Sequence, residues 1–89
     1  MPDAPKVFIY TTDPCGYCRM VKSLLDKKGV EYTEKMVFGG TPEWEEMRRV
    51  TGGARTVPQV IINGQVIGGY PDLVRLQESG DLDALLNHA

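Results

Sequence analysis

The apolar residues in the first half of the chain alternate between strand-like and helix-like spacing. Residues 6–10 form a short, mostly apolar run, which is typical of a strand that is buried on both faces of a sheet. Residues 15–28 have helical spacing, and Gly29 suits the end of a helix because glycine readily adopts a left-handed conformation. The apolar face of this predicted helix consists of Val21, Leu24 and Leu25. Apolar and polar residues alternate loosely over residues 30–37, which predicts a second strand. This strand should be parallel to the first, because a helix that connects two strands of one sheet usually forms a right-handed crossover.

A second helix is predicted between two glycine pairs, Gly39-Gly40 and Gly52-Gly53. Thr41 is a favourable N-cap, and Pro42 suits the first helical position because proline lacks an N–H that would be unpaired there. Its apolar stripe is interpreted as core packing and consists of Trp44, Met47 and Val50.

The last third of the chain predicts a β-hairpin followed by helices. Asn63-Gly64 joins the apolar runs 59–62 and 65–67, and Asn-Gly between such runs favours a two-residue hairpin turn. A helix should follow over about residues 71–79, and Asp81 should cap a last short helix. This order of elements indicates an α/β fold with a four-stranded mixed sheet flanked by helices.

Size and charge restrict the class of protein. The 89 residues are 42% hydrophobic and fit one domain, which we place at residues 6–89 behind a flexible tail of residues 1–5. Ten basic and twelve acidic residues, with no basic stripe, argue against nucleic acid as a partner. No apolar run is long enough to span a membrane, and residues 1–5 do not resemble a targeting peptide, so cytoplasm is the expected compartment.

Two cysteines, Cys15 and Cys18, indicate the chemistry of the chain. Cys15 falls at the start of the first predicted helix, where unpaired backbone N–H groups and the helix dipole favour a thiolate. The dipole contributes roughly 0.3 to 2 kcal/mol, which lowers the pKa of a thiol from about 8.5 to about 7 at best. We therefore expect Cys15 to attack a disulfide and Cys18, one turn further in, to resolve the mixed disulfide.

Two other interpretations of the cysteine pair stay open. A zinc site needs two more ligands, and the chain offers no third cysteine and one histidine, His88, so zinc would have to be shared between two chains. A structural disulfide is typical of secreted, cysteine-dense chains, whereas this chain has two cysteines and no apolar signal segment. Redox chemistry is the favoured interpretation.

Three motifs downstream of Cys15-Gly16-Tyr17-Cys18 complete a recognisable pattern. They are Thr56-Val57-Pro58, Gly68-Gly69 and Asp72-Leu73. In this order and at these separations the motifs resemble those of dithiol glutaredoxins, and the similarity covers the chain from Lys6 onward. The resemblance implies a thioredoxin fold and a glutathione-disulfide oxidoreductase with glutathione as cosubstrate. It implies protein disulfides and glutathionylated proteins as partners, and a role in electron transport and cell redox homeostasis.

The resemblance also implies a glutathione site. Pro58 matches a proline that follows a cis peptide bond, which would leave the backbone of Val57 free to pair with an extended peptide such as glutathione. Asp72 matches the residue that binds the amino group of glutathione, and the glycine pair lets a ligand approach the backbone closely. The residues assigned to this site are Tyr17, Thr56, Val57, Pro58, Gly69, Tyr70 and Asp72. Candidates for its glycine carboxylate are Arg48, Arg49 and Arg55.

The chain departs from the family pattern at three positions. Gly16 stands where proline is commonest, and Thr12 stands where a lysine is often found. Pro71 stands where family members usually offer an N–H to the ligand, and proline has none.

Two alternative functions stand beside glutathione-dependent thiol–disulfide exchange. Some glutaredoxins with glycine or serine after the first cysteine hold a [2Fe–2S] cluster between two chains, and here Cys15 and glutathione thiols would be the ligands. The other alternative is a thioredoxin-like reductant that uses another thiol or a reductase enzyme. We expect a monomer, or a dimer where a cluster bridges two chains.

Overall fold

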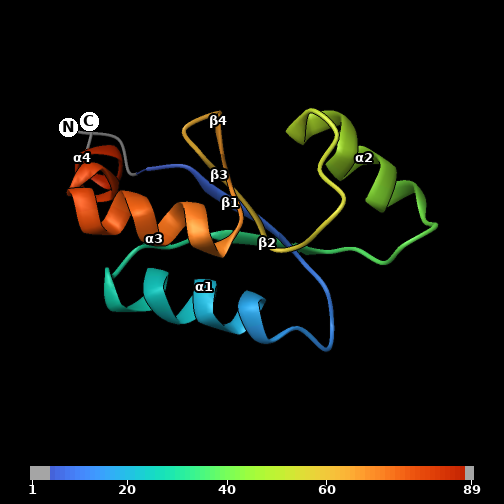
Figure 1. Cartoon of the computed structure of the whole chain (residues 1–89), viewed down its shortest axis with the longest axis horizontal. Helices are drawn as coiled ribbons and strands as arrows, with labels where there is room; N and C mark the ends of the chain where they lie inside the picture. The colour runs from blue at the N-terminus through green and yellow to red at the C-terminus, as the bar shows by residue number, and fades with distance from the viewer. Residues whose placement is uncertain (1–4, 88–89) are drawn as a thin grey trace.

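The computed structural model describes residues 5–87 (Figure 1). The strands in these residues are β1 (Val7–Thr11), β2 (Thr33–Met36), β3 (Gln59–Ile62) and β4 (Gln65–Gly68). The helices are α1 (Gly16–Lys27), α2 (Pro42–Thr51), α3 (Tyr70–Ser79) and α4 (Asp81–Leu86). Their order confirms the predicted sequence of elements.

The four strands form one mixed sheet in the order β2-β1-β3-β4. β1 pairs with β2 in parallel, and β3 pairs antiparallel with both β1 and β4. The turn between β3 and β4 has positive φ angles at Asn63 (52°) and Gly64 (82°), which is the backbone that Asn-Gly favours in a two-residue hairpin. The predicted four-stranded mixed sheet is therefore confirmed.

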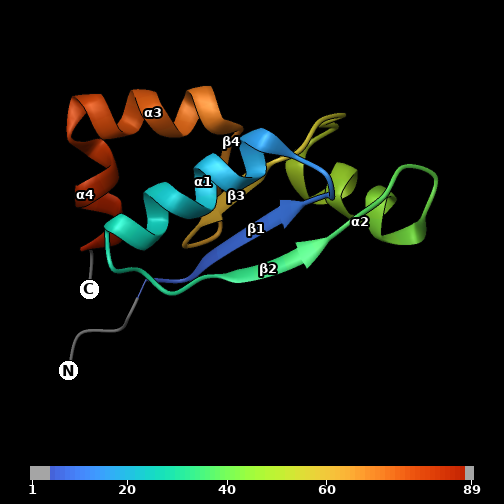
Figure 2. The ribbon, with the colours of Figure 1, turned by 90° about the horizontal axis from the view of Figure 1, so that it is seen from below.

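Helices cover both faces of the sheet. The main core contains β1 and β3 side chains packed against α1, α3 and α4, and its buried members are Val7, Ile9, Val21, Leu25, Val60, Ile62, Leu73, Leu82 and Leu86. A smaller cluster on the opposite face is formed by Tyr10, Val37 and Met47. Figures 1 and 2 both show α1 and α3 side by side, with α2 apart from them.

A polar cluster ties α2 to the sheet. The hydroxyl of Tyr10 donates to Oε2 of Glu46 at 3.0 Å, and Nζ of Lys35 lies 3.0 Å from both carboxylate oxygens of Glu46. Burial, together with the hydrogen bond to Glu46 and its negative charge, raises the pKa of Tyr10 to about 12. Because of this raised pKa, the buried phenol stays neutral over the usual pH range, and its hydrogen bond to Glu46 holds α2 against the sheet.

Three local expectations were wrong. β2 covers Thr33–Met36 rather than residues 30–37, because Val30 and Tyr32 pack against the main core from the preceding connection. Val50 is 46% exposed, so only Trp44 and Met47 of the predicted stripe pack inward. The N-cap of α4 is Gly80, and Asp81 is the first helical residue.

The division into a tail of residues 1–5 and a domain of residues 6–89 stays a prediction, because residues 1–4 and 88–89, including His88, lie outside the described part. In residues 5–87, no helix combines the length and apolar character needed to cross a membrane.

Candidate active site

Cys15 and Cys18 form a disulfide at the start of α1, with their Cα atoms 5.3 Å apart. Cys15 is the N-cap residue, with an extended backbone, and its Sγ accepts a hydrogen bond from the N–H of Cys18 at 3.1 Å. Cys15 is half-buried, whereas Cys18 is 1% exposed. Sequence reasoning expected an outer and an inner cysteine, and the structure places them in that arrangement.

The electrostatic surroundings of Cys15 favour a thiolate once the disulfide is reduced. The first turn of α1 carries no acidic side chain that would oppose the positive end of the helix dipole. The N–H of Cys18, which already points at Sγ of Cys15, would donate a stronger hydrogen bond to a charged sulfur.

A second network fixes the strand that leads into the cysteines. Thr11, the last residue of β1, is fully buried, and its hydroxyl donates to Oε2 of Glu34 at 2.6 Å. Nζ of Lys22, on α1, donates to the same oxygen at 2.7 Å. These hydrogen bonds from Lys22 and Thr11 lower the pKa of Glu34. β1, β2 and α1 are thus joined by one carboxylate next to the loop of residues 12–14.

The Val57-Pro58 peptide bond is cis, as the resemblance implies. Neither the N–H nor the C=O of Val57 has a hydrogen-bond partner within residues 5–87. Gln59 holds this loop, since its buried side-chain amide donates to the carbonyl of Thr56 at 2.9 Å. Sequence reasoning missed Gln59, although a polar residue at the start of an apolar strand was a usable signal.

The start of α3 lies against the same loop. A Cβ added to Gly69 would stand 3.5 Å from the carbonyl oxygen of Pro58. The N–H groups of Tyr70 and Asp72 have no partner within the described residues, as expected for the first turn of a helix. This end of α3 therefore offers the backbone donors that the sequence predicted there.

Asp72 has contacts that sequence reasoning did not foresee. Its Oδ2 accepts the N–H of Gly69 at 3.0 Å, and its Oδ1 pairs with Arg75. Gly68 has a φ of 116°, and a Cβ there would collide with the Asp72 carboxylate. Arg75 was missed, although its position three residues after an aspartate on a helix favours an ion pair.

Two tyrosines connect the cysteines to α3. Tyr17 is 61% exposed, and its ring centroid lies 5.9 Å from that of Tyr70, with an interplanar angle of 30°. A chain of neighbouring residues therefore lies at one end of the sheet. It runs from Cys15 and Cys18 through Tyr17 and Tyr70 to Gly69 and Pro58.

No contact within residues 5–87 joins the three candidate arginines to this group. The Nη1 atom of Arg48 lies 3.9 Å from Oε2 of Glu45. The Nε atom of Arg48 is buried and has no hydrogen-bond partner within residues 5–87. Arg49 and Arg55 are exposed. Their assignment to a ligand carboxylate stays a prediction.

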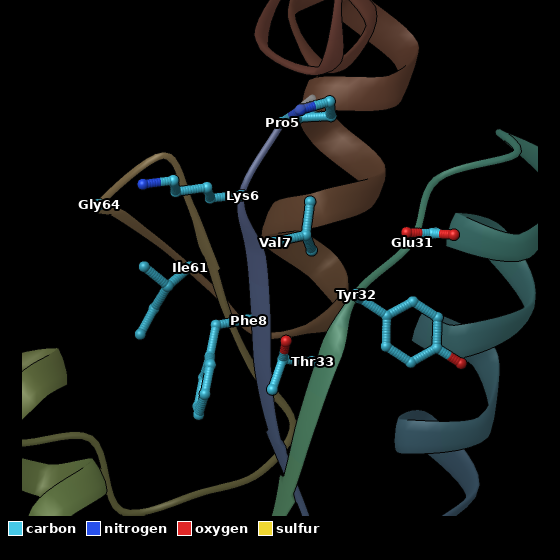
Figure 3. A pocket seen from close by; sticks show the side chains of 9 residues that line it. All are labelled: Pro5, Lys6, Val7, Phe8, Glu31, Tyr32, Thr33, Ile61 and Gly64. Carbon is cyan, nitrogen blue, oxygen red and sulfur yellow. The ribbon is translucent and has the colours of Figure 1, made fainter. Parts of the chain in front are cut away.

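A hollow of about 460 Å³ lies at the other end of the sheet (Figure 3). Its lining includes Lys6 and Phe8 at the beginning of β1 and Thr33 at the beginning of β2, whereas Cys15 follows the end of β1. Figure 3 shows Phe8 and Ile61 pointing to the same side of the sheet. This hollow is separate from the cysteine site.

The fold and the cysteine pair together define a thiol–disulfide oxidoreductase with the thioredoxin fold. A half-buried sulfur at a helix start, backed by a buried sulfur one turn later, suits a thiol that attacks disulfides and a second thiol that completes the exchange.

Comparison with known proteins identifies the family. The family model described as Glutaredoxin matches residues 7–67. The chain is 45% identical over 83 residues to Glutaredoxin 1 of Rickettsia prowazekii (strain Madrid E), covering 92% of this chain and 87% of the relative. It is also 45% identical over 80 residues to Glutaredoxin 3 of Escherichia coli (strain K12), covering 90% and 95%. The chain therefore belongs to the glutaredoxin family, which confirms the resemblance.

Solved structures agree with this assignment. The solution structure of glutaredoxin from Brucella melitensis has a TM-score of 0.77 and 40% identity, covering 93% of this chain and 89% of that one. The crystal structure of the buckwheat glutaredoxin–glutathione complex has a TM-score of 0.80 and 29% identity, covering 92% and 76%.

Proposed function

We propose that this glutaredoxin uses Cys15 as the nucleophile and Cys18 as the resolving thiol, with glutathione as the reductant. The Cys15 thiolate attacks one sulfur of a protein disulfide, forms a new S–S bond with it and expels the other sulfur as a thiolate. Cys18 then attacks Cys15, which releases the second protein thiol and leaves the Cys15–Cys18 disulfide. Two glutathione molecules reduce that disulfide and leave as glutathione disulfide, so two electrons pass from glutathione to the substrate.

The observation that carries the proposal is the difference in exposure within the pair. Cys15 is half-buried and Cys18 is 1% exposed. An external disulfide must approach the attacking sulfur from solvent, so Cys15 is the accessible nucleophile. Cys18 needs to reach only Cys15, its partner in the disulfide.

Glutathione has a suitable place beside Cys15. The unpaired backbone groups of Val57 can pair with the extended tripeptide, while Thr56 and Pro58 frame that contact. The N–H groups of Tyr70 and Asp72 offer donors to the glutamyl carboxylate at a helix N-terminus. Glutathione in the related buckwheat structure supports this assignment.

Tyr17 and Gly69 complete the proposed glutathione site. Tyr17 lies between the two cysteines in the chain and has an exposed ring that could shield the disulfide, and Gly69 has no side chain to block the backbone beside Pro58. The carboxylate of Asp72 would bind the amino group of glutathione while it also accepts the N–H of Gly69 and pairs with Arg75.

Two variants test the division of labour. Cys15→Ser should abolish reduction of both protein disulfides and glutathione mixed disulfides. Cys18→Ser should lose protein-disulfide reduction and keep deglutathionylation, because that reaction needs one attacking thiol and free glutathione. Steady-state rates with glutathione and glutathione reductase measure both activities. Equal, complete loss of deglutathionylation in the two variants would contradict the proposal, and faster turnover with a thioredoxin reductase would favour the thioredoxin-like alternative.

A cluster-binding role is the second candidate, and Gly16 favours it. Glycine leaves this helix start more adaptable than proline would, so two active sites could approach one cluster, and a Cβ at Gly16 would meet no atom within 4 Å. Residues 5–87 contain no group of three or more His, Cys, Asp or Glu side chains that could hold a metal, so each chain would contribute Cys15 and glutathione the remaining thiolates. Anaerobic reconstitution with iron, sulfide and glutathione should give a coloured dimer, and a colourless monomer would exclude this role.

We place the protein in the cytoplasm as a monomer in the absence of a cluster. The cytoplasm is proposed because such an enzyme needs glutathione, which a reducing compartment provides. Its proposed partners are disulfide-containing and glutathionylated proteins.

A further inference from the structure

A groove runs between α1 and α3, next to the cysteine site. The two helices lie side by side with their first residues at the same end (Figures 1 and 2). A hollow of about 360 Å³ is lined by residues of both helices, which are Met20, Ser23, Leu24, Lys27, Tyr70 and Gln77. Apart from Tyr70, no lining residue belongs to the proposed catalytic or glutathione-binding groups.

The groove is connected to the cysteine site through Tyr70. Tyr70 lines it, and the ring of Tyr70 packs against the ring of Tyr17, which stands between Cys15 and Cys18 in the chain. A polypeptide that presents a disulfide to Cys15 can therefore cross the tyrosine pair and enter the groove without leaving the surface of the protein.

The lining of the groove is apolar near the cysteines and positive at the far end. Met20 is 44% exposed, and Leu24 is partly buried, packs against the main core and also lines the groove. A methionine side chain adapts to apolar partners of different shape. Lys27 is the one charged residue of the lining, and it forms no ion pair with residues 5–87. A bound segment that complements this lining would carry an apolar side chain near its cysteine and an acidic side chain further along.

We propose that this groove docks the segment beside the reacting cysteine of a protein substrate. An apolar side chain of that segment contacts Met20 and Leu24, and an acidic side chain pairs with Lys27. From Cys15 to Lys27 the helix rises roughly 18 Å, at about 1.5 Å per residue. An extended chain covers that length in roughly five or six residues, so the apolar residue falls about three positions from the substrate cysteine and the acid about five.

This inference rests on the proposed reduction of protein disulfides by Cys15, and its test leaves glutathione out. In the Cys18→Ser background, the substrate is a peptide whose single cysteine carries thionitrobenzoate in a mixed disulfide. Cys15 forms a disulfide with the peptide sulfur, the peptide–thionitrobenzoate bond breaks, and the electron pair leaves with the coloured thionitrobenzoate thiolate. The measured quantity is the rate constant for the peptide divided by that for the same derivative of N-acetylcysteine amide.

Two peptides are compared. One carries leucine at three and glutamate at five positions on both sides of the cysteine, and the other carries lysine at all four places. The leucine–glutamate peptide should give a ratio about three- to tenfold higher, in keeping with a partly exposed apolar contact and an exposed ion pair. Lys27→Glu should abolish or reverse this preference, and Met20→Ser should reduce it.

Matched controls lie outside the groove. Lys6→Glu makes the same change of charge at the far end of the sheet, and Met36→Ser alters a methionine on β2 that is 47% exposed. Both should keep the preference for the leucine–glutamate peptide. Equal ratios for the two peptides, or the same loss in the control variants, would overturn the docking groove while Cys15 chemistry stands. No reaction of Cys15 with the N-acetylcysteine amide derivative would overturn the proposed function and the docking together.

Discussion

Replacing Pro71 should strengthen the binding of glutathione. Pro71 is the second residue of α3 and is exposed, and it lies between Tyr70 and Asp72, whose N–H groups have no partner within residues 5–87. Serine at this position restores a third backbone donor at the helix N-terminus, where the glutamyl carboxylate of glutathione is expected.

The magnitude follows from the type of hydrogen bond. A bond to a charged group contributes roughly 1.5 to 3 kcal/mol, which corresponds to an affinity gain of about tenfold to 150-fold. The same substitution loses the restriction that proline places on the unfolded chain, about 0.4 to 1 kcal/mol of stability. For a domain of this size that loss lowers Tm by about 2 to 8 °C.

Calorimetric titration of glutathione into the Cys15→Ser background measures the affinity without turnover. Pro42→Ser is the matched control, because Pro42 also stands in the first turn of an exposed helix start, on α2. It should lower Tm by a similar amount and leave glutathione affinity unchanged. Unchanged or weaker glutathione affinity in the Pro71→Ser variant would refute the reasoning and would show that Tyr70 and Asp72 already satisfy the carboxylate.

Two further predictions concern the supports of the site. Since hydrogen bonds from Lys22 and Thr11 lower the pKa of Glu34, its stabilisation is present above the usual carboxyl pKa of 4.5 and is lost as pH falls through the lowered value. Urea unfolding should therefore show Glu34→Gln less stable than the unaltered chain at pH 7, with the difference closing in acid; a difference that persists unchanged at low pH would contradict this. Gly68→Ala, at a φ of 116° and against the Asp72 carboxylate, should cost about 1 to 3 kcal/mol in the free energy of unfolding, whereas Gly39→Ala, which has open space, should cost far less.

Local features of the fold could be predicted because they depend on near neighbours in the chain. The hairpin at Asn63-Gly64 follows from the positive φ angles that these residues tolerate. The start of α2 follows from Thr41, whose hydroxyl accepts the N–H of Trp44 at 3.2 Å. Cys15 could be placed at a helix start because the apolar spacing of the following residues is helical.

Periodicity predicts which side of an element is apolar, but it does not give the length of an element or the extent to which another element covers it. Val50 has the helical spacing of Trp44 and Met47, yet it is 46% exposed and does not join the cluster in which they pack. Val30 has the alternation expected of a strand, yet it packs against the core from a connection. Both outcomes depend on the distance between elements, which no local pattern contains.

The sequence by itself therefore determined the order of the elements, the position of the cysteine pair and, through its motifs, the family. Only the tertiary structure decided what surrounds that pair. The Tyr17–Tyr70 contact and the groove that ends at Lys27 each join α1 to α3, which are far apart in the chain. Such contacts form because the sheet and its two faces bring separate elements to one end of the molecule, and their spacing along the chain carries no record of it.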